Sequence, residues 1–104
     1  MFEAIKNFFK PPLKIDYAKL VKAGAIIVDV RTANEYQSGH IDGSINIPIV
    51  DLSNNPGKLK DKKKVVIACC ASGMRSARAK TILRSRGFLS VYDGGAWNNL
   101  QKKL

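Results

Sequence analysis

The segment Lys64–Gly87, KVVIACCASGMRSARAKTILRSRG, decides the fold of this chain. It opens with an apolar run, residues 64–69, that has the length of a buried strand. It closes with apolar residues at helical spacing and then Gly87, which predicts a helix over 76–86. A glycine-bearing turn, residues 70–75, joins the two. A buried strand that leads directly into a helix is typical of an α/β domain.

The flanking sequence continues this alternation of strands and helices. Strands are expected at 25–30, 44–48, 64–69 and 89–92. Helices are expected at 17–22 with Asp16 as its cap, from the capping box Thr32-Ala-Asn-Glu35 to about Gly39, at 76–86 and at 96–104. Residues 51–63 are polar and predict a loop, with room for one helical turn before it, and Asp93-Gly94-Gly95 predicts a turn. The pattern indicates an α/β domain with a mainly parallel sheet.

The length and composition indicate one ordinary globular domain. The chain has 104 residues, of which 45 % are hydrophobic and 25 % are charged. No apolar run approaches the ~20 residues that span a bilayer, and the N-terminus carries an early acid and no apolar core of a secretory signal, so a cytoplasmic location is expected. Residues 1–12, phenylalanine-rich at helical spacing and ended by two prolines, predict an amphipathic arm, and residues 13–104 predict the single domain.

The charge of the chain is strongly positive, with a formal net charge of +10. The basic residues are dispersed over 58–64, 75–86 and the C-terminal end, without interleaved aromatic residues. This favours a solvated basic surface, which can also attract small anions or an acidic protein partner. Binding to nucleic acid is not expected.

The only two cysteines, Cys69 and Cys70, are adjacent. A disulfide framework needs cysteines spread along the chain, so this pair does not form one. One histidine and two cysteines without a spacer do not predict a metal site, and nothing in the sequence implies a cofactor. Three readings remain: buried thiols, reactive thiols, or one of each.

Cys70 lies where the buried strand ends and the helix begins. Ligands bind at the carboxyl ends of strands in α/β sheets, and a tight turn there can point several N–H groups at an anion. Together with the helix dipole, such a turn lowers the pKa of a thiol from about 8.5. The sequence therefore predicts a nucleophile at Cys70 in a cradle for a small anion. An inert core thiol would leave this loop unexplained.

Three motifs in order resemble those of the rhodanese family, over residues 13–100. They are Cys70-x-x-Gly73-x-Arg75-Ser76, the upstream segment Ile27-Val-Asp-Val-Arg31 with Glu35-Tyr36 and Gly39-His40-Ile41-x-Gly43-Ser-Ile-Asn-Ile-Pro48, and Gly94-Gly95 followed by Trp97. The resemblance implies a rhodanese-like α/β sandwich with a central, mainly parallel five-stranded sheet flanked by helices. It also implies that Cys70 takes a sulfane sulfur from thiosulfate or a persulfide donor and passes it to cyanide or a thiol. The substrate-binding residues would be Ala71, Ser72, Gly73, Met74, Arg75 and Ser76.

The adjacent cysteines allow two frames for this loop. Four residues separate Cys70 from Arg75, the short loop associated with sulfur transfer, whereas five separate Cys69 from Arg75, as in phosphatases of the same fold. Gly73 lies three residues after Cys70, as the rhodanese motif requires. Phosphatase or arsenate-reductase-like chemistry is therefore the weaker alternative. A second alternative is a persulfide-carrying partner module in a sulfur relay, with little activity on small molecules.

Several other side chains have predicted roles. Arg75 is expected to hold the loop by pairing with Glu35 or Asp29. His40 is expected to be a structural hydrogen-bonding residue, and Trp97 to close the core. Cys69 is interpreted as a core residue, with a resolving thiol as the alternative. Because Ala71 carries no charge, the charge that attracts an anionic donor would come from backbone N–H groups and from bases such as Arg78 or Lys80.

Overall fold

The computed structural model describes residues 14–54, 57 and 59–104. In chain order the elements are α2 (Tyr17–Lys22), β1 (Ile26–Asp29), α3 (Ala33–Gln37), β2 (Ile45–Asn46), α4 (Ile49–Leu52), β3 (Val65–Cys70), α5 (Met74–Ser85), β4 (Ser90–Ala96) and α6 (Trp97–Lys102). The predicted arm, residues 1–12, lies outside the described residues. Within them, no helix combines the length and the apolar character needed to cross a membrane.

The strands form one parallel sheet in the order β2-β1-β3-β4. The mainly parallel sheet is thus confirmed. The five strands implied by the family resemblance are not, because the described residues form four. The sequence itself carries only four strand patterns, and the structure agrees with that narrower reading. Strand β3 lies between β1 and β4. Its last residue, Cys70, therefore lies at the carboxyl edge of the sheet, with a strand on either side.

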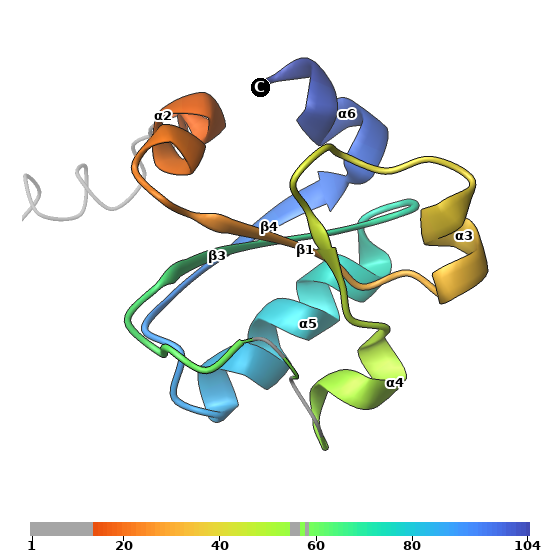
Figure 1. Ribbon diagram of the computed structural model, residues 1–104. Helices are drawn as coiled ribbons and strands as arrows, with labels where there is room; N and C mark the ends of the chain where they lie inside the picture. Colours follow the sequence, from red (N-terminus) through yellow and green to blue (C-terminus); the bar gives the residue numbers. More distant parts are fainter. Residues whose placement is uncertain (1–13, 55–56, 58) are drawn as a thin grey trace, which may run out of the picture.

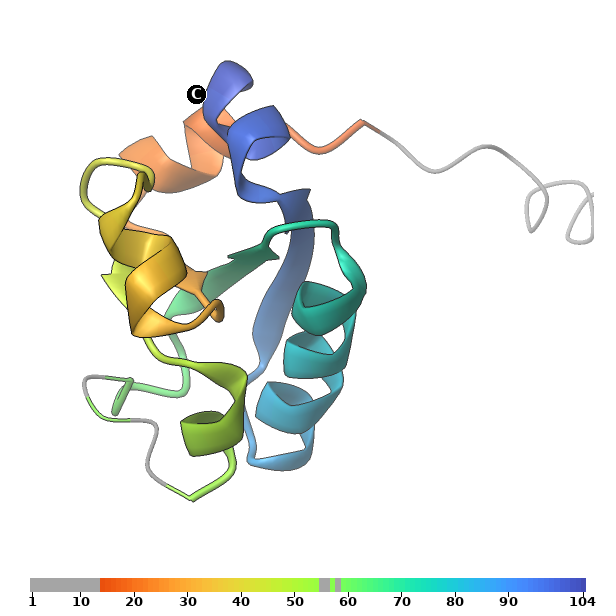
Figure 2. The same ribbon diagram turned by 90° about the vertical axis from the view of Figure 1, so that its right-hand side faces the viewer.

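Helices cover both faces of the sheet, α4 and α5 on one face and α2 and α6 on the other (Figures 1 and 2). The side chains of β3 alternate between these two layers, as in any strand. Val66, Ala68 and Cys70 pack in the cluster with α4 and α5, whereas Ile67 and Cys69 pack with α2 and α6. All five are buried, because a parallel sheet covered on both faces has no solvent side.

Local capping signals place two of the helices. Asp16 accepts a hydrogen bond from the N–H of Lys19 at 3.0 Å and starts α2 at the predicted residue. The capping box of α3 is complete: the Thr32 hydroxyl accepts from the Glu35 N–H, and the Glu35 carboxylate accepts from the Thr32 N–H. Both sequence predictions are confirmed. They could be made from the sequence because these bonds join residues only three positions apart.

The structure differs from the sequence prediction around β4. Residues 93–95 form no separate turn; β4 continues through them to Ala96 and pairs with β3, with a register shift between Ala68 and Cys70. A Cβ atom on Gly94 would lie 2.9 Å from both Ile67 Cγ2 and Leu100 Cδ2. The glycine is therefore needed for close packing against the sheet and α6, and not for a reversal of the chain.

The bounds of two helices, α4 and α5, also differ from the sequence prediction. Helix α5 starts at Met74, two residues before the predicted start, because Gly73 serves as its N-cap. The single helical turn expected near residue 51 is α4, which begins after Pro48 and ends at Leu52.

Candidate active site

The loop after β3 is shaped by Gly73. Its φ of +101° lies in the left-handed region, which a side chain disfavours, and it lets the chain turn from strand into helix within three residues. As a result the loop folds back over the end of β3. The N–H of Gly73 then lies 2.9 Å from Cys70 Sγ, and the N–H of Ser76, in the first turn of α5, lies 3.3 Å from it.

These contacts set the ionisation of Cys70. Burial alone raises the pKa of the Cys70 thiol. The backbone N–H groups of Ser76, Gly73 and Ser72 donate hydrogen bonds that favour the charged form, and the pKa of Cys70 stays below the ordinary value for cysteine. The positive end of the α5 dipole acts in the same direction. The loop thus favours a thiolate, the form in which cysteine is a nucleophile.

The sulfur is sheltered while the loop above it is exposed. Cys70 has 0 % of its surface exposed, whereas Ala71, Ser72 and Met74 are exposed to solvent. The arrangement excludes bulk water from the thiolate, so the N–H groups act at low effective dielectric.

Cys69 lies in a different environment from its neighbour. Its side chain packs with Tyr17, Ile27 and Leu100 in the cluster on the opposite face of the sheet. Burial, and then the charge of Asp29, raise the pKa of its thiol to about 12. The core role expected for Cys69 fits this position, and a resolving role does not, because the two sulfurs point to opposite faces. Among the described residues no three His, Cys, Asp or Glu side chains cluster as metal ligands.

Arg75 holds the loop from the other side. Its Nη1 and Nη2 donate to the Glu35 carboxylate at 2.7 and 2.9 Å, so the predicted pair with Glu35 is confirmed. The Arg75 hydrogen bond and the Thr32 N–H lower the pKa of Glu35 to about 2. Asp29, the other candidate, pairs with Arg31 instead. The charge of Arg75 is thereby balanced within the protein.

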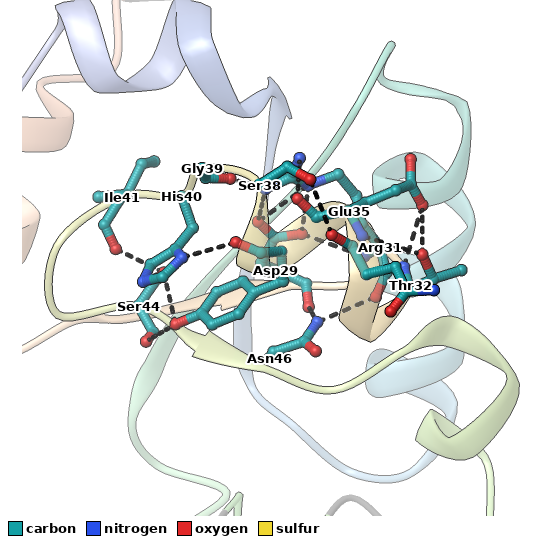
Figure 3. A network of polar contacts seen from close by, with 12 residues as sticks. Asp29, Arg31, Thr32, Glu35, Ser38, Gly39, His40, Ile41, Ser44 and Asn46 are labelled. Carbon is teal, nitrogen blue, oxygen red and sulfur yellow. Dashed lines mark hydrogen bonds and ion pairs between the residues drawn. The ribbon is translucent and has the colours of Figure 1, made fainter.

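A buried network supports the segment that carries Glu35 (Figure 3). Arg31 donates to both carboxylate oxygens of Asp29 and to the carbonyl oxygen of Gly39, the latter at 2.6 Å. Its guanidinium lies 4.7 Å from the ring centre of Trp97. Trp97 packs against the α2–α6 cluster, as expected for a residue that closes the core.

His40 takes part in the same network. Its Nδ1 lies 2.7 Å from the carbonyl oxygen of Tyr36, and its ring stacks on the Tyr36 ring with centroids 3.7 Å apart. The Tyr36 hydroxyl donates to the carbonyl oxygen of Ser44 at 2.6 Å. These bonds fix the turn between α3 and β2, which matches the structural role expected for His40 (Figure 3).

The two bases that could attract an anionic donor lie further along α5. Arg78 is exposed and lines a hollow between α4 and α5 together with Ile49, Val50 and Ile82. Lys80 is partly buried on the same helix. Both positions are beyond the first turn of α5, so the N–H groups of the loop, rather than these side chains, are the donors next to Sγ.

One residue at the site escaped the sequence prediction. The sequence predicts a turn at Asp93, whereas in the structure its Oδ1 accepts from the Ser76 hydroxyl at 2.6 Å and from the Gly95 N–H at 3.0 Å. Ser76 in turn lies 3.5 Å from Cys70 Sγ through its own hydroxyl. The only signal in the sequence is an acid directly before two glycines, and this does not indicate a contact with a helix 17 residues away.

Comparison with known proteins identifies the family of this chain. The family model that describes the rhodanese-like domain matches residues 15–101 of this chain. A thiosulfate sulfurtransferase of Shewanella oneidensis is 37 % identical over 76 residues, which cover 69 % of this chain and 74 % of the relative. A tRNA sulfurtransferase of Thermoplasma acidophilum is 34 % identical over 80 residues, 77 % of this chain but 15 % of the relative. A putative sulfur carrier protein of Bacillus subtilis is 34 % identical over 65 residues, 62 % of this chain and 35 % of the relative.

A solved structure extends the comparison to the fold. A rhodanese from Escherichia coli, determined with anions, superposes with a TM-score of 0.68 at 31 % identity, covering 73 % of this chain and 91 % of the other. Fold and loop together define a parallel α/β domain with a hydrogen-bonded thiol at a strand-to-helix turn. The chain belongs to the rhodanese-like domain family.

Proposed function

We propose that this protein is a sulfurtransferase in which Cys70 carries the sulfur. The observation that carries the proposal is the pair of N–H groups, from Gly73 and Ser76, that donate to Cys70 Sγ in a short loop at the carboxyl edge of the sheet. A thiolate held in this way needs no histidine base. The similarity to a thiosulfate sulfurtransferase supports thiosulfate as a donor.

The proposed reaction has two displacement steps. In the first, the Cys70 thiolate attacks the outer sulfur of thiosulfate; a new S–S bond forms, the S–S bond of the donor breaks, and sulfite leaves with the electron pair. In the second, cyanide or a thiolate attacks the outer sulfur of the persulfide, and Cys70 leaves as a thiolate. The loop N–H groups stabilise the negative charge in both steps.

The recognition of an anionic donor would depend mainly on the backbone. Arg75 is neutralised by Glu35, and the loop residues Ala71, Ser72 and Met74 carry no charge. The N–H groups of residues 71–76 and the dipole of α5 therefore supply the positive potential beside the sulfur. The Escherichia coli rhodanese solved with anions is consistent with such a site in the fold.

A second candidate is a persulfide-carrying module that receives its sulfur from another protein. The relatives favour it, because the matched region is only 15 % of the tRNA sulfurtransferase and 35 % of the putative sulfur carrier. In these longer relatives the matched region is one part of a larger chain. The net charge of +10 would suit an acidic protein partner.

The proposal is tested by mass spectrometry of the intact protein after incubation with thiosulfate. We expect the mass to increase by one sulfur atom in the wild type and in Cys69→Ser, and not in Cys70→Ser. The two serine variants are matched, because each removes one buried thiol from adjacent positions. Loss of the added sulfur in Cys69→Ser alone would overturn the assignment to Cys70.

Steady-state turnover separates the two candidates. The sulfurtransferase converts thiosulfate and cyanide to sulfite and thiocyanate with parallel double-reciprocal plots, as expected of a two-step displacement. A carrier module shows no such turnover and still gains one sulfur atom from a persulfide-bearing protein.

A further inference from the structure

The Ser76 hydroxyl has three polar neighbours and one proton to give. Its Oγ lies 2.6 Å from Asp93 Oδ1, 3.0 Å from the carbonyl oxygen of Gly73 and 3.5 Å from Cys70 Sγ. Ser76 is fully buried, so water does not compete for these contacts. Which neighbour receives the proton decides what the hydroxyl offers to the sulfur.

The carboxylate of Asp93 is the strongest acceptor of the three. A bond of 2.6 Å to a charged oxygen is short and about twice as strong as a bond to a neutral acceptor. The carbonyl oxygen of Gly73 already accepts from the N–H of Ala77 at 3.1 Å. The proton of Ser76 therefore lies on the side of Asp93, and a lone pair of Oγ faces Cys70.

This orientation favours the neutral thiol. A protonated Sγ can donate to Ser76 Oγ, which forms a chain of hydrogen bonds from Cys70 through Ser76 to Asp93. A thiolate would instead face the lone pair of that oxygen. The N–H groups of Gly73 and Ser76 favour the thiolate, so the two sets of contacts around Sγ oppose each other.

We propose that Asp93 is a positioning residue for Cys70: by holding the Ser76 hydroxyl proton it withholds that proton from the sulfur, and so limits how much of Cys70 is thiolate. The inference rests on the proposed role of Cys70 as the sulfur carrier. Asp93 acts through Ser76 and touches no reacting atom.

The fold holds Asp93 in place for this task. The register shift between Ala68 and Cys70 lies beside it, and the Gly95 N–H donates to the same oxygen that Ser76 uses. The Tyr17 hydroxyl, from α2, lies 3.3 Å from the backbone carbonyl oxygen of Asp93. Ser76 of α5 and Gly95 of its own strand thus hold the carboxylate, while Tyr17 of α2 holds the backbone of Asp93.

The other charged and titratable groups around Cys70, Ser76 and Asp93 do not alter the effect of Asp93 on Cys70. Arg75 of α5 favours a negative Cys70 but is paired with Glu35 of α3. At the end of β1, Asp29 is paired with Arg31. Among the described residues, Cys69 of β3, Tyr17 of α2 and Tyr92 of β4 are further titratable groups on the neighbouring elements. The thiol of Cys69, with a pKa of about 12, stays neutral near pH 7.

The test measures the pH dependence of alkylation at Cys70 with iodoacetamide, in the Cys69→Ser background. In Asp93→Asn the oxygen that accepts from Ser76 and Gly95 is kept while the charge is removed. We expect the apparent pKa of Cys70 to fall by about one unit, which gives roughly tenfold faster alkylation well below that pKa. The control Asp42→Asn makes the same charge change in an exposed turn between α3 and β2 and leaves the profile unchanged.

A second background shows whether the hydroxyl carries the effect. In Ser76→Ala, which keeps the N–H bond to Sγ, Asp93→Asn is expected to produce less than half of its shift. An equal shift in both backgrounds, or the same profile for Asp93→Asn as for Asp42→Asn, would overturn the proposal.

The single variant Ser76→Ala serves if Asp93→Asn does not fold. Because the hydroxyl gives no proton to the sulfur, its removal is expected to leave the Cys70 pKa unchanged or lower. A rise of about one unit would contradict the proposal, since it would show that the hydroxyl already stabilises the thiolate. None of these readouts uses sulfur transfer, so they stand or fail separately from the thiosulfate experiment.

Discussion

At the scale of single residues, different groups order the loop and contact the sulfur. Arg75 pairs with Glu35 through two short hydrogen bonds, from a side chain that is about one third exposed. It orders the loop from outside, while backbone N–H groups face the sulfur. The contacts that order the loop therefore come from the protein itself.

Glu35→Gln isolates this ion pair. Gln can still accept from the Thr32 N–H, so the capping box of α3 is kept and only the charge is lost. At pH 7 we expect the variant to be less stable by about 0.5 kcal/mol, the size of a partly exposed pair. The difference is measured by urea unfolding of both proteins.

The pH dependence of that difference has a definite sign. The pKa of Glu35 is lowered from 4.5 to about 2, so the ion pair contributes its stabilisation above pH 4.5 and loses it as the pH falls towards 2. The gap between wild type and Glu35→Gln therefore closes at low pH. A gap that stays constant from pH 7 to pH 2 would show that the charge of Glu35 does not stabilise the fold.

At the scale of elements, prediction from sequence succeeded where the signal is local. The caps Asp16 and Thr32 act over three residues, and they placed α2 and α3 correctly. The apolar run of β3 and the periodicity of α5 have the same local character. The path of β4 does not, because residues 93–96 are held as strand by pairing with β3, and Gly94 is a packing requirement that looks like a turn in the sequence.

Gly94→Ala tests that reading of β4. The new Cβ would lie 2.9 Å from Ile67 Cγ2 and Leu100 Cδ2 and 3.0 Å from the Ala68 carbonyl oxygen, so the strand or these side chains must shift. We expect a loss of about 1–3 kcal/mol in the free energy of unfolding. In the double variant with Leu100→Ala, the loss should be smaller than the sum of the losses in the two single variants, because the truncated Leu100 makes room for the new Cβ. Full additivity would argue against crowding at this glycine.

The site shows the same limit of sequence-based prediction. The segment from Cys70 to Ser76 is contiguous, so its motif and the Gly73 turn are visible in the sequence. The partner of Arg75 lies 40 residues away, and the sequence predicts it only as one of two acids, Glu35 or Asp29. Asp93 could not be found, since its contact with Ser76 depends on the register of β4 against β3.

At the scale of the whole molecule, the feature that stands out is the excess of positive charge. The chain has eighteen lysines and arginines but only eight acids. Two of those acids, Asp29 and Glu35, form ion pairs beside the site. Self-repulsion among the remaining bases opposes the folded state. Salt should therefore act on stability as well as on the binding of an anion.

We expect the Tm at pH 7 to rise between about 0.01 M and 0.15 M NaCl, where the screening length falls from about 30 to 8 Å. Lys60→Glu, an exposed position, should reduce this rise, and Lys60→Arg, which keeps the charge, should not. A Tm that falls with salt in the wild type would show that favourable ion pairs outweigh the repulsion.

The opposite orientation of the two cysteines has a consequence for damage. Cys69 and Cys70 are joined by one peptide bond, yet their sulfurs lie in separate cores on either side of the sheet. A sulfenic acid on Cys70 would thus find no thiol of its own chain with which to condense. Its repair would be bimolecular and first order in whatever free thiol surrounds the protein, so the lifetime of the oxidised state would follow the redox composition of the medium and not the fold.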